Sequence, residues 1–146
     1  MKLVIFDLDG VLIDSRDLHY DVLNKALASI SPDYVISKKE HLSKYDGLST
    51  KQKLVKLTKE KNLDESLYED IWKLKQELTF IELNNVVLKN DKLISVFSYL
   101  KTNDFKIAIA SNSIRKTIDI VVENSGIKEF VDLVVSNEDV NYPKPN

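Results

Sequence analysis

The chain opens with a short apolar run and an acidic turn, which read KLVIFDLDG over residues 2–10. The run at residues 2–6 is rich in strand-favouring side chains, and no turn residue interrupts it. Such a run predicts a strand that is buried on both faces, as in parallel sheets. Asp7, Asp9 and Gly10 follow at once. The sequence therefore places two carboxylates and a glycine at the carboxyl end of the first strand.

The next part of the chain, from about residue 16 to about residue 82, shows helical periodicity. From Arg16 to Ile30 the apolar residues recur at spacings of three and four, and Pro32 ends the pattern. Sequences typical of capping boxes at Ser37 and Ser49 predict two further helix starts. A longer amphipathic helix is predicted by the spacing of Leu67, Ile71, Leu74, Leu78 and Ile81.

Strands and helices alternate in the last part of the chain. The predicted elements are a helix at 93–100 capped by Asn90 or Asp91, a strand at 105–110, a helix at 114–122 closed by Gly126, and a strand at 131–135. Alternation of this kind indicates a parallel α/β sheet. We predict an incomplete Rossmann-like sheet core built from residues 1–14 and 83–146, with an α-helical cap inserted at 15–82.

Composition excludes several classes of protein. The formal charge of −2, from 21 basic and 23 acidic residues, gives no electrostatic reason to expect a nucleic-acid partner. The absence of cysteine excludes disulfides, thiolate metal sites and a cysteine nucleophile. No apolar run approaches the ~20 residues that span a bilayer, so we expect no membrane association and a cytoplasmic location.

Ligands of open α/β sheets bind at the carboxyl ends of the strands, which makes the residues there the candidates for function. Asp7 and Asp9 repel one another and favour a bound hard cation such as Mg²⁺. Ser111 and Asn112 follow the second strand and suit a phosphate group, although both residue types also cap helices whatever the function. Lys144, between two prolines beyond the third strand, could neutralise a phosphoryl group.

These strand ends resemble a known family. The run FDLDGVLIDS at residues 6–15, Ser111 within Ser-Asn-Ser, and Lys144 before Pro145 resemble, in order, the first three motifs of the haloacid dehalogenase-like hydrolases. The helical stretch resembles the cap that this family inserts after the first motif. The likeness is to the β-phosphoglucomutase-like and phosphoglycolate phosphatase-like branch. It implies a magnesium-dependent phosphohydrolase that acts on a small phosphorylated metabolite.

The resemblance also implies a role for each matching residue. Asp7 attacks phosphorus and forms an aspartyl phosphate, and Asp9 serves as general acid and then as general base. Mg²⁺ is bound by the Asp7 carboxylate and the Asp9 backbone carbonyl. The phosphoryl group is held by Gly10, Ser111 and Lys144, and Asn112 helps through its backbone N–H. An acid at the position of Asp9 favours phosphate esters over the halides that dehalogenases cleave.

The helical stretch carries three weaker candidates for substrate contact. The segment 45–50 resembles the substrate-specificity loop of this branch, which points to Gly47 and Ser49. His19 lies where related proteins carry a histidine that faces the site. A turn with a helix cap, and a packed or exposed histidine, explain the same residues equally well. The family's mutases often carry an arginine near this loop, where this chain has Thr50 and Lys51, which counts against a sugar-phosphate mutase. A mutase is kept as the alternative activity.

A fourth motif, which supplies a further acid to Mg²⁺ in this family, is not found, because the sequence ends at Asn146 within the loop of the third motif. We therefore expect a truncated chain with impaired catalysis, in which Lys144 does not reach the site. The rival hypothesis is a catalytically inert fragment or interaction module on the same fold. A response-regulator receiver is excluded by the long helical insert. The substrate and the oligomeric state stay open.

Overall fold

The computed structural model describes residues 1–145 of the chain, and its backbone divides into two compact units. The sheet unit comprises Met1–Arg16 and the chain from Phe80 onward. The helical unit comprises Asp17–Thr79. No helix in the described part of the chain is long and apolar enough to cross a membrane.

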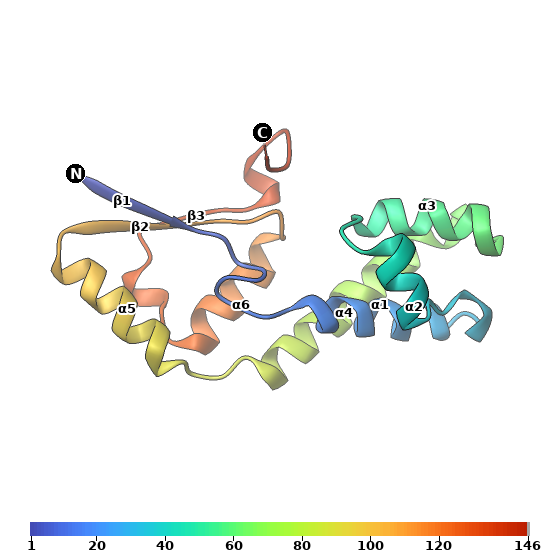
Figure 1. Cartoon of the computed structure of the whole chain (residues 1–146), viewed down its shortest axis with the longest axis horizontal. Coiled ribbons are helices and arrows are strands. Elements are labelled where there is room, and N and C mark those ends of the chain that lie inside the picture. The colour runs from blue at the N-terminus through green and yellow to red at the C-terminus, as the bar shows by residue number, and fades with distance from the viewer. Residues whose placement is uncertain (146) are drawn as a thin grey trace. The chain divides into compact units, whose positions relative to one another are not determined.

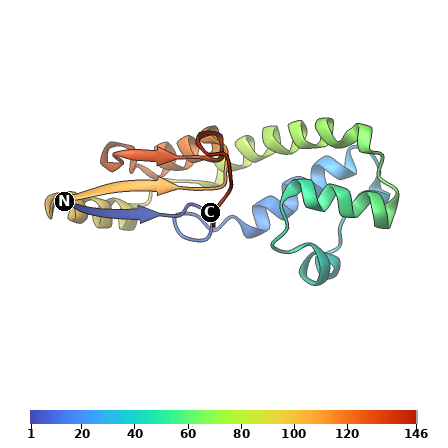
Figure 2. The same cartoon turned by 90° about the horizontal axis from the view of Figure 1, so that it is seen from above.

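The sheet unit holds three parallel strands, namely β1 (Lys2–Phe6), β2 (Phe105–Ala110) and β3 (Leu133–Val135), in the order β1-β2-β3. Figure 2 shows all three running in the same direction. Val4 lies opposite Ile107 in the register of the first pair. The parallel sheet and its helices confirm the predicted α/β class.

Helices α5 (Asp91–Thr102) and α6 (Arg115–Ser125) lie on the same side of this sheet, below it in Figure 1. Right-handed crossovers that step in one direction, from β1 to β2 and then to β3, place their helices on one face. The helix-facing side chains form the core of this unit. There the ring of Phe6 stacks on Phe97 of α5, with centroids 4.7 Å apart.

The prediction that the first strand is buried on both faces is wrong. The side chains of Leu3 and Ile5 are 57% and 62% exposed, on the face that the helices leave uncovered. Leu133 of β3 is 58% exposed on the same face, because it pairs with Ala108, the neighbour of Ile5. The apolar run itself does not say which face receives helices, since the crossovers decide that.

The ends of the core helices follow the sequence signals. Asn90 caps α5 through a hydrogen bond from the backbone N–H of Leu93 to its side chain. Gly126 ends α6 in the left-handed region at φ 84°. Short turns η4 (Lys128–Phe130) and η5 (Asn137–Asp139) flank β3. Both predicted caps of this unit are therefore confirmed.

The insert is helical, as predicted. Its elements are α1 (Arg16–Ala28), η1 (Pro32–Tyr34), α2 (Lys38–Glu40), η2 (His41–Tyr45), α3 (Thr50–Lys61), η3 (Glu65–Leu67) and α4 (Tyr68–Val86), the last of which continues into the sheet unit. Complete capping boxes form at Ser37 with Glu40 and at Ser49 with Gln52. Both predicted helix starts are confirmed.

The helical unit builds its own apolar core. Nine buried side chains cluster there, and all but Tyr45 are aliphatic residues contributed by α1, α3, α4 and the loops between them. Towards the end of α4 the buried face differs from the predicted one. Ile81, which was predicted to lie on the apolar face, is 58% exposed, while Thr79 and Leu83 are each 1% exposed. The chain's only tryptophan, Trp72, lies in the part of α4 that belongs to this unit and is 45% exposed.

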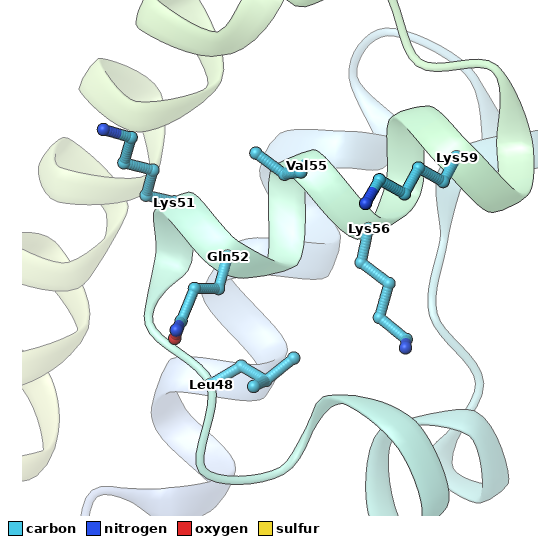
Figure 3. A pocket seen from close by; sticks show the side chains of 6 residues that line it. All are labelled: Leu48, Lys51, Gln52, Val55, Lys56 and Lys59. Carbon is cyan, nitrogen blue, oxygen red and sulfur yellow. The ribbon is translucent and has the colours of Figure 1, made fainter.

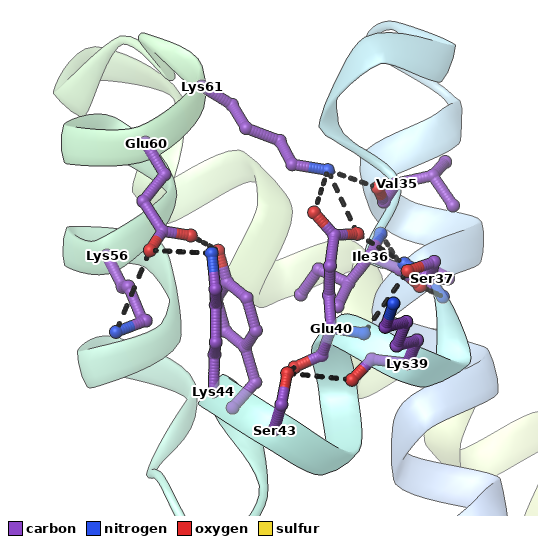
Figure 4. A network of polar contacts seen from close by, with 12 residues as sticks. Val35, Ile36, Ser37, Lys39, Glu40, Ser43, Lys44, Lys56, Glu60 and Lys61 are labelled. Atoms are coloured by element: carbon purple, nitrogen blue, oxygen red, sulfur yellow. Dashed lines mark hydrogen bonds and ion pairs between the residues drawn. The ribbon is translucent and has the colours of Figure 1, made fainter.

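Hydrogen bonds and ion pairs between polar side chains also connect the elements of this unit (Figure 4). The buried Tyr45 donates its hydroxyl to Glu60 Oε2 at 2.8 Å, and burial raises the pKa of this phenol. Lys61 Nζ donates to the Val35 carbonyl at 2.7 Å and lies 3.4 Å from Glu40 Oε1. These contacts join α3 to the segment that precedes it.

Candidate active site

Asp7 stands directly after β1, where the chain folds into a tight loop. The backbone N–H of Leu8 donates to Asp7 Oδ1 at 2.7 Å. Leu8 is fully buried, and its carbonyl accepts the N–H groups of Leu12 at 2.9 Å and Ile13 at 3.1 Å. Gly10 has φ 78°, which suits glycine, and its N–H donates to the Ile13 carbonyl at 2.7 Å. The buried leucine and the folded loop thus fix the direction of Asp7.

Two serine hydroxyls bind the carboxylate of Asp9. Ser15 donates to Oδ1, and Ser113 donates to Oδ2 at 3.1 Å. Ser15 is only 3% exposed, so packing holds its hydroxyl in place. Ser113 follows β2, so its bond joins the ends of the first and second strands. Neither serine is among the residues predicted for the site, although both lie within the quoted motifs.

Lys144 reaches the same strand ends. Its Nζ lies 2.9 Å from Asp7 Oδ1 and donates to the carbonyl of Ala110 at 2.8 Å. The expectation that this lysine does not reach the site is therefore wrong. A position near the chain end predicts mobility only where nothing anchors the backbone, and here the loop is anchored through Asn112.

The residues that follow β2 are tied into the sheet and the neighbouring loop. Ser111 is 5% exposed, its N–H donates to the Val135 carbonyl at 3.0 Å, and its Oγ accepts the N–H of Ser113 at 3.1 Å. The exposed Asn112 accepts the backbone N–H of Lys144 at 2.8 Å and donates to the Lys144 carbonyl at 3.3 Å. The Asn112 side chain thus joins the end of β2 to the loop that carries Lys144, while the Ser111 hydroxyl stabilises the turn after β2.

None of the residues Ser111, Asn112 and Ser113 caps α6. The N-cap position is held by Ile114, which has an extended backbone and makes no side-chain cap bond. The first N–H of the helix, from Arg115, donates instead to Glu138 Oε2 at 2.6 Å. The alternative explanation of the Ser-Asn-Ser segment as an ordinary helix cap is thus wrong.

Asp139 has a structural task beside Glu138. Its carboxylate accepts the N–H and the hydroxyl of Ser136 at 2.7 and 2.9 Å, and it pairs with Arg115 at 2.6 Å. The bonds from Ser136, with Arg115 adding to them, lower the pKa of Asp139. These acids fasten the end of β3 to the start of α6.

Metal-binding capacity at the strand ends rests on few ligands. Among residues 1–145, no group of three or more histidine, cysteine or acidic side chains could hold a metal ion. Mg²⁺ commonly uses only one or two carboxylates, keeps several waters and takes phosphate oxygens from the substrate. The Asp7 carboxylate, 48% exposed, and the neighbouring Asp9 carbonyl fit such a site.

The remaining candidates, His19, Gly47 and Ser49, belong to the helical unit. Ser49 caps α3, since its side chain accepts the Gln52 N–H at 3.2 Å. Gly47 has φ 76°, a turn conformation that favours glycine. Local structure accounts for both Gly47 and Ser49. Substrate contact by these two residues and by His19 stays a prediction.

A separate hollow of about 380 Å³ runs along α3 in the helical unit (Figure 3). Its lining combines four lysine or glutamine side chains with two aliphatic ones, and the residues are Leu48, Lys51, Gln52, Val55, Lys56 and Lys59. Lys56 pairs with Glu60 at 3.8 Å, which balances part of this charge. The hollow shares no residue with the strand-end site.

Solved structures share this fold. The chain matches a putative β-phosphoglucomutase from Thermotoga maritima at a TM-score of 0.75 and 21% identity, over 100% of this chain and 66% of that one. It matches CbbY from Rhodobacter sphaeroides in complex with phosphate at a TM-score of 0.82 and 16% identity, over 100% of this chain and 68% of that one. A predicted phosphoglycolate phosphatase from Haemophilus somnus gives a TM-score of 0.82 and 18% identity, over 100% and 67%.

The chain thus spans about two thirds of the length of these structures. No curated protein sequence matches it. The model of one protein family matches residues 4–146, which is nearly the whole sequence and includes all three motifs. The resemblance drawn from those motifs is confirmed, and the chain belongs to the haloacid dehalogenase-like hydrolases.

Proposed function

We propose that this chain carries the nucleophile and the phosphate-binding half of a magnesium-dependent phosphohydrolase that acts on a small phosphorylated metabolite. The observation that carries the proposal is the meeting of Asp7 and Lys144 at 2.9 Å beside Asp9, at the carboxyl ends of parallel strands. Phosphoryl transfer needs this combination of a positioned nucleophile and fixed positive charge.

Asp7 is the nucleophile. The Leu8 N–H donates to its Oδ1, and the Lys144 ammonium forms an ion pair with the same oxygen at 2.9 Å. Oδ2 is therefore the oxygen that attacks phosphorus, which forms an aspartyl phosphate and expels the substrate alcohol. The fixed loop after β1 holds the carboxylate in line for this displacement.

Asp9 transfers the proton. In its protonated form it donates to the leaving alcohol oxygen, and as the carboxylate it accepts a proton from the water that hydrolyses the aspartyl phosphate. The hydroxyls of Ser15 and Ser113 orient this carboxyl group.

The phosphoryl group is held by the Lys144 ammonium and the Ser111 hydroxyl, with Gly10 allowing close approach of the loop backbone. Mg²⁺ bound by the Asp7 carboxylate and the Asp9 carbonyl would neutralise phosphoryl charge. We place this activity in the cytoplasm, with neither a nucleic acid nor a membrane as partner. The helical unit would act as the cap, with His19, Gly47 and Ser49 contacting the substrate.

The test is a phosphatase screen with Mg²⁺ over sugar phosphates, phosphoglycolate, nucleotides and p-nitrophenyl phosphate. Asp7→Asn should abolish all turnover, because an amide cannot form the acyl phosphate, and no ³²P should remain on the protein after denaturation. Asp119→Asn, an exposed acid on α6, is the matched control and should leave turnover unchanged.

Different outcomes separate the alternatives. Conversion of one sugar phosphate to its isomer without release of phosphate would identify a mutase. A wild-type chain that shows neither turnover nor phosphorylation of Asp7 would overturn the proposal in favour of an inert module.

A further inference from the structure

Lys144 is held both at its ammonium group and at its backbone. Its ammonium donates to the Ala110 carbonyl at 2.8 Å and pairs with Asp7 at 2.9 Å. Its backbone is bracketed by Asn112, whose carboxamide accepts the Lys144 N–H at 2.8 Å and donates to the Lys144 carbonyl at 3.3 Å. Ala110 and Asn112 flank Ser111 in the sequence. Residues at the end of β2 therefore bind both the ammonium group and the backbone of Lys144.

Neither packing nor helix capping explains these bonds between Asn112 and Lys144. Asn112 is exposed, so packing does not demand it, and it does not cap α6. Lys144 lies in an exposed loop outside every helix and strand. A lysine has a flexible four-carbon stem and a point charge, so its position depends on how firmly its backbone is fixed.

We propose that Asn112 is a positioning residue, which presents Lys144 to the phosphoryl group by fixing the lysine backbone. The family resemblance implies only that the backbone N–H of Asn112 helps to bind phosphate. Its side chain has a separate task, since both of its polar ends are used on Lys144. This inference rests on the proposed function for its consequence, although the bracket itself can be tested without any activity.

The first experiment measures amide hydrogen exchange at Lys144 by NMR in the intact chain. In wild type the Lys144 N–H should be protected, and Asn112→Ala should speed its exchange by about 5- to 10-fold, the loss of one ordinary hydrogen bond. Asn112→Asp keeps the acceptor oxygen and should retain most of the protection. Asn103→Ala is the matched control, because Asn103 is also exposed and donates to a backbone carbonyl, that of Tyr99.

The second experiment measures the binding of inorganic phosphate with Mg²⁺ by calorimetry. Asn112→Ala and Lys144→Ala should each weaken binding several-fold, and the double variant should bind no more weakly than Lys144→Ala alone. If Asn112→Ala weakens binding by the same factor in the Lys144→Ala background, Asn112 contacts phosphate directly and the inference is wrong.

The two experiments fail in different ways. Unchanged exchange at Lys144 in Asn112→Ala overturns the bracket, whatever the activity of the protein. Protected exchange that Asn112→Ala abolishes, in a wild-type chain that binds no phosphate, would uphold the bracket and count against the phosphohydrolase proposal instead.

Discussion

In the helical unit, Tyr45 is fully buried and its hydroxyl still reaches Glu60, whereas in the sheet unit Leu3 and Ile5 stand 57% and 62% exposed. The helical unit encloses a core of its own, in which a buried tyrosine hydroxyl finds a carboxylate partner. The other covers one face of its sheet and gathers polar side chains at its strand ends that packing does not require. A feature without a packing reason is the better guide to function, and these features lie in the sheet unit.

The largest expected effect is on the rate of phosphatase turnover, and it comes from a substitution in the sheet unit. Asp9→Asn should slow phosphatase turnover by roughly 10²–10⁴-fold, the usual contribution of a general acid, while substrate binding changes little. Steady-state kinetics on the best substrate of the screen would measure this, with Asp119→Asn as control. A loss that appears only in KM would remove Asp9 from the proton-transfer role.

The next effect contrasts the two units in stability. Leu57→Ala, at a fully buried position of the helical unit, should cost about 2–5 kcal/mol of unfolding free energy. Leu3→Ala, on the uncovered face of the sheet, should change it by less than about 0.5 kcal/mol. Urea denaturation followed by circular dichroism measures both. Equal losses would mean that the open face of the sheet is covered in solution.

How much of the molecule the sequence predicts depends on the range of the interactions. The caps at Asn90, Ser49 and Gly126 are local, and each was predicted correctly. Burial of β1 was mispredicted because it depends on which face the crossovers cover, and the reach of Lys144 was mispredicted because it depends on a distant side chain.

The candidate site shows the same limit. The sequence placed Asp7 and Asp9 at a strand end from spacing alone. It did not reveal the serines that hold Asp9, since Ser113 lies 104 residues away and only the fold brings the two together. The glutamate that satisfies the first N–H of α6 was missed for the same reason.

A smaller effect compares two left-handed glycines, one in each unit. Gly126→Ala would place a methyl group 2.9 Å from Ile94 Cδ1, in addition to the strain of a positive φ, and should cost at least about 1–2 kcal/mol. Gly47→Ala meets no atom within 4 Å and should cost only the backbone strain. The difference in urea midpoint tests this, and an equal shift would mean that Ile94 moves aside freely.

The smallest effect is a pH dependence of the helical unit. His41 is 4% exposed, and burial followed by the charge of Lys53 lowers its pKa below the ordinary 6.5, although Asp46 at 3.9 Å opposes the shift. Below about pH 6.5 the unfolded chain binds this proton more readily, so stability should be full above that pH and fall as the pH drops towards 5. Thermal unfolding across this range measures the slope, which His41→Phe should flatten.

The single tryptophan lies in the helical unit, at Trp72. Its fluorescence emission therefore follows the unfolding of that unit alone, while the far-ultraviolet signal sums both. If the two transitions coincide, the units unfold together, and if they separate, each has its own stability. Because the chain has no cysteine, one cysteine introduced into the sheet would be a unique label, and energy transfer from Trp72 to it would report in solution on the distance between the two units.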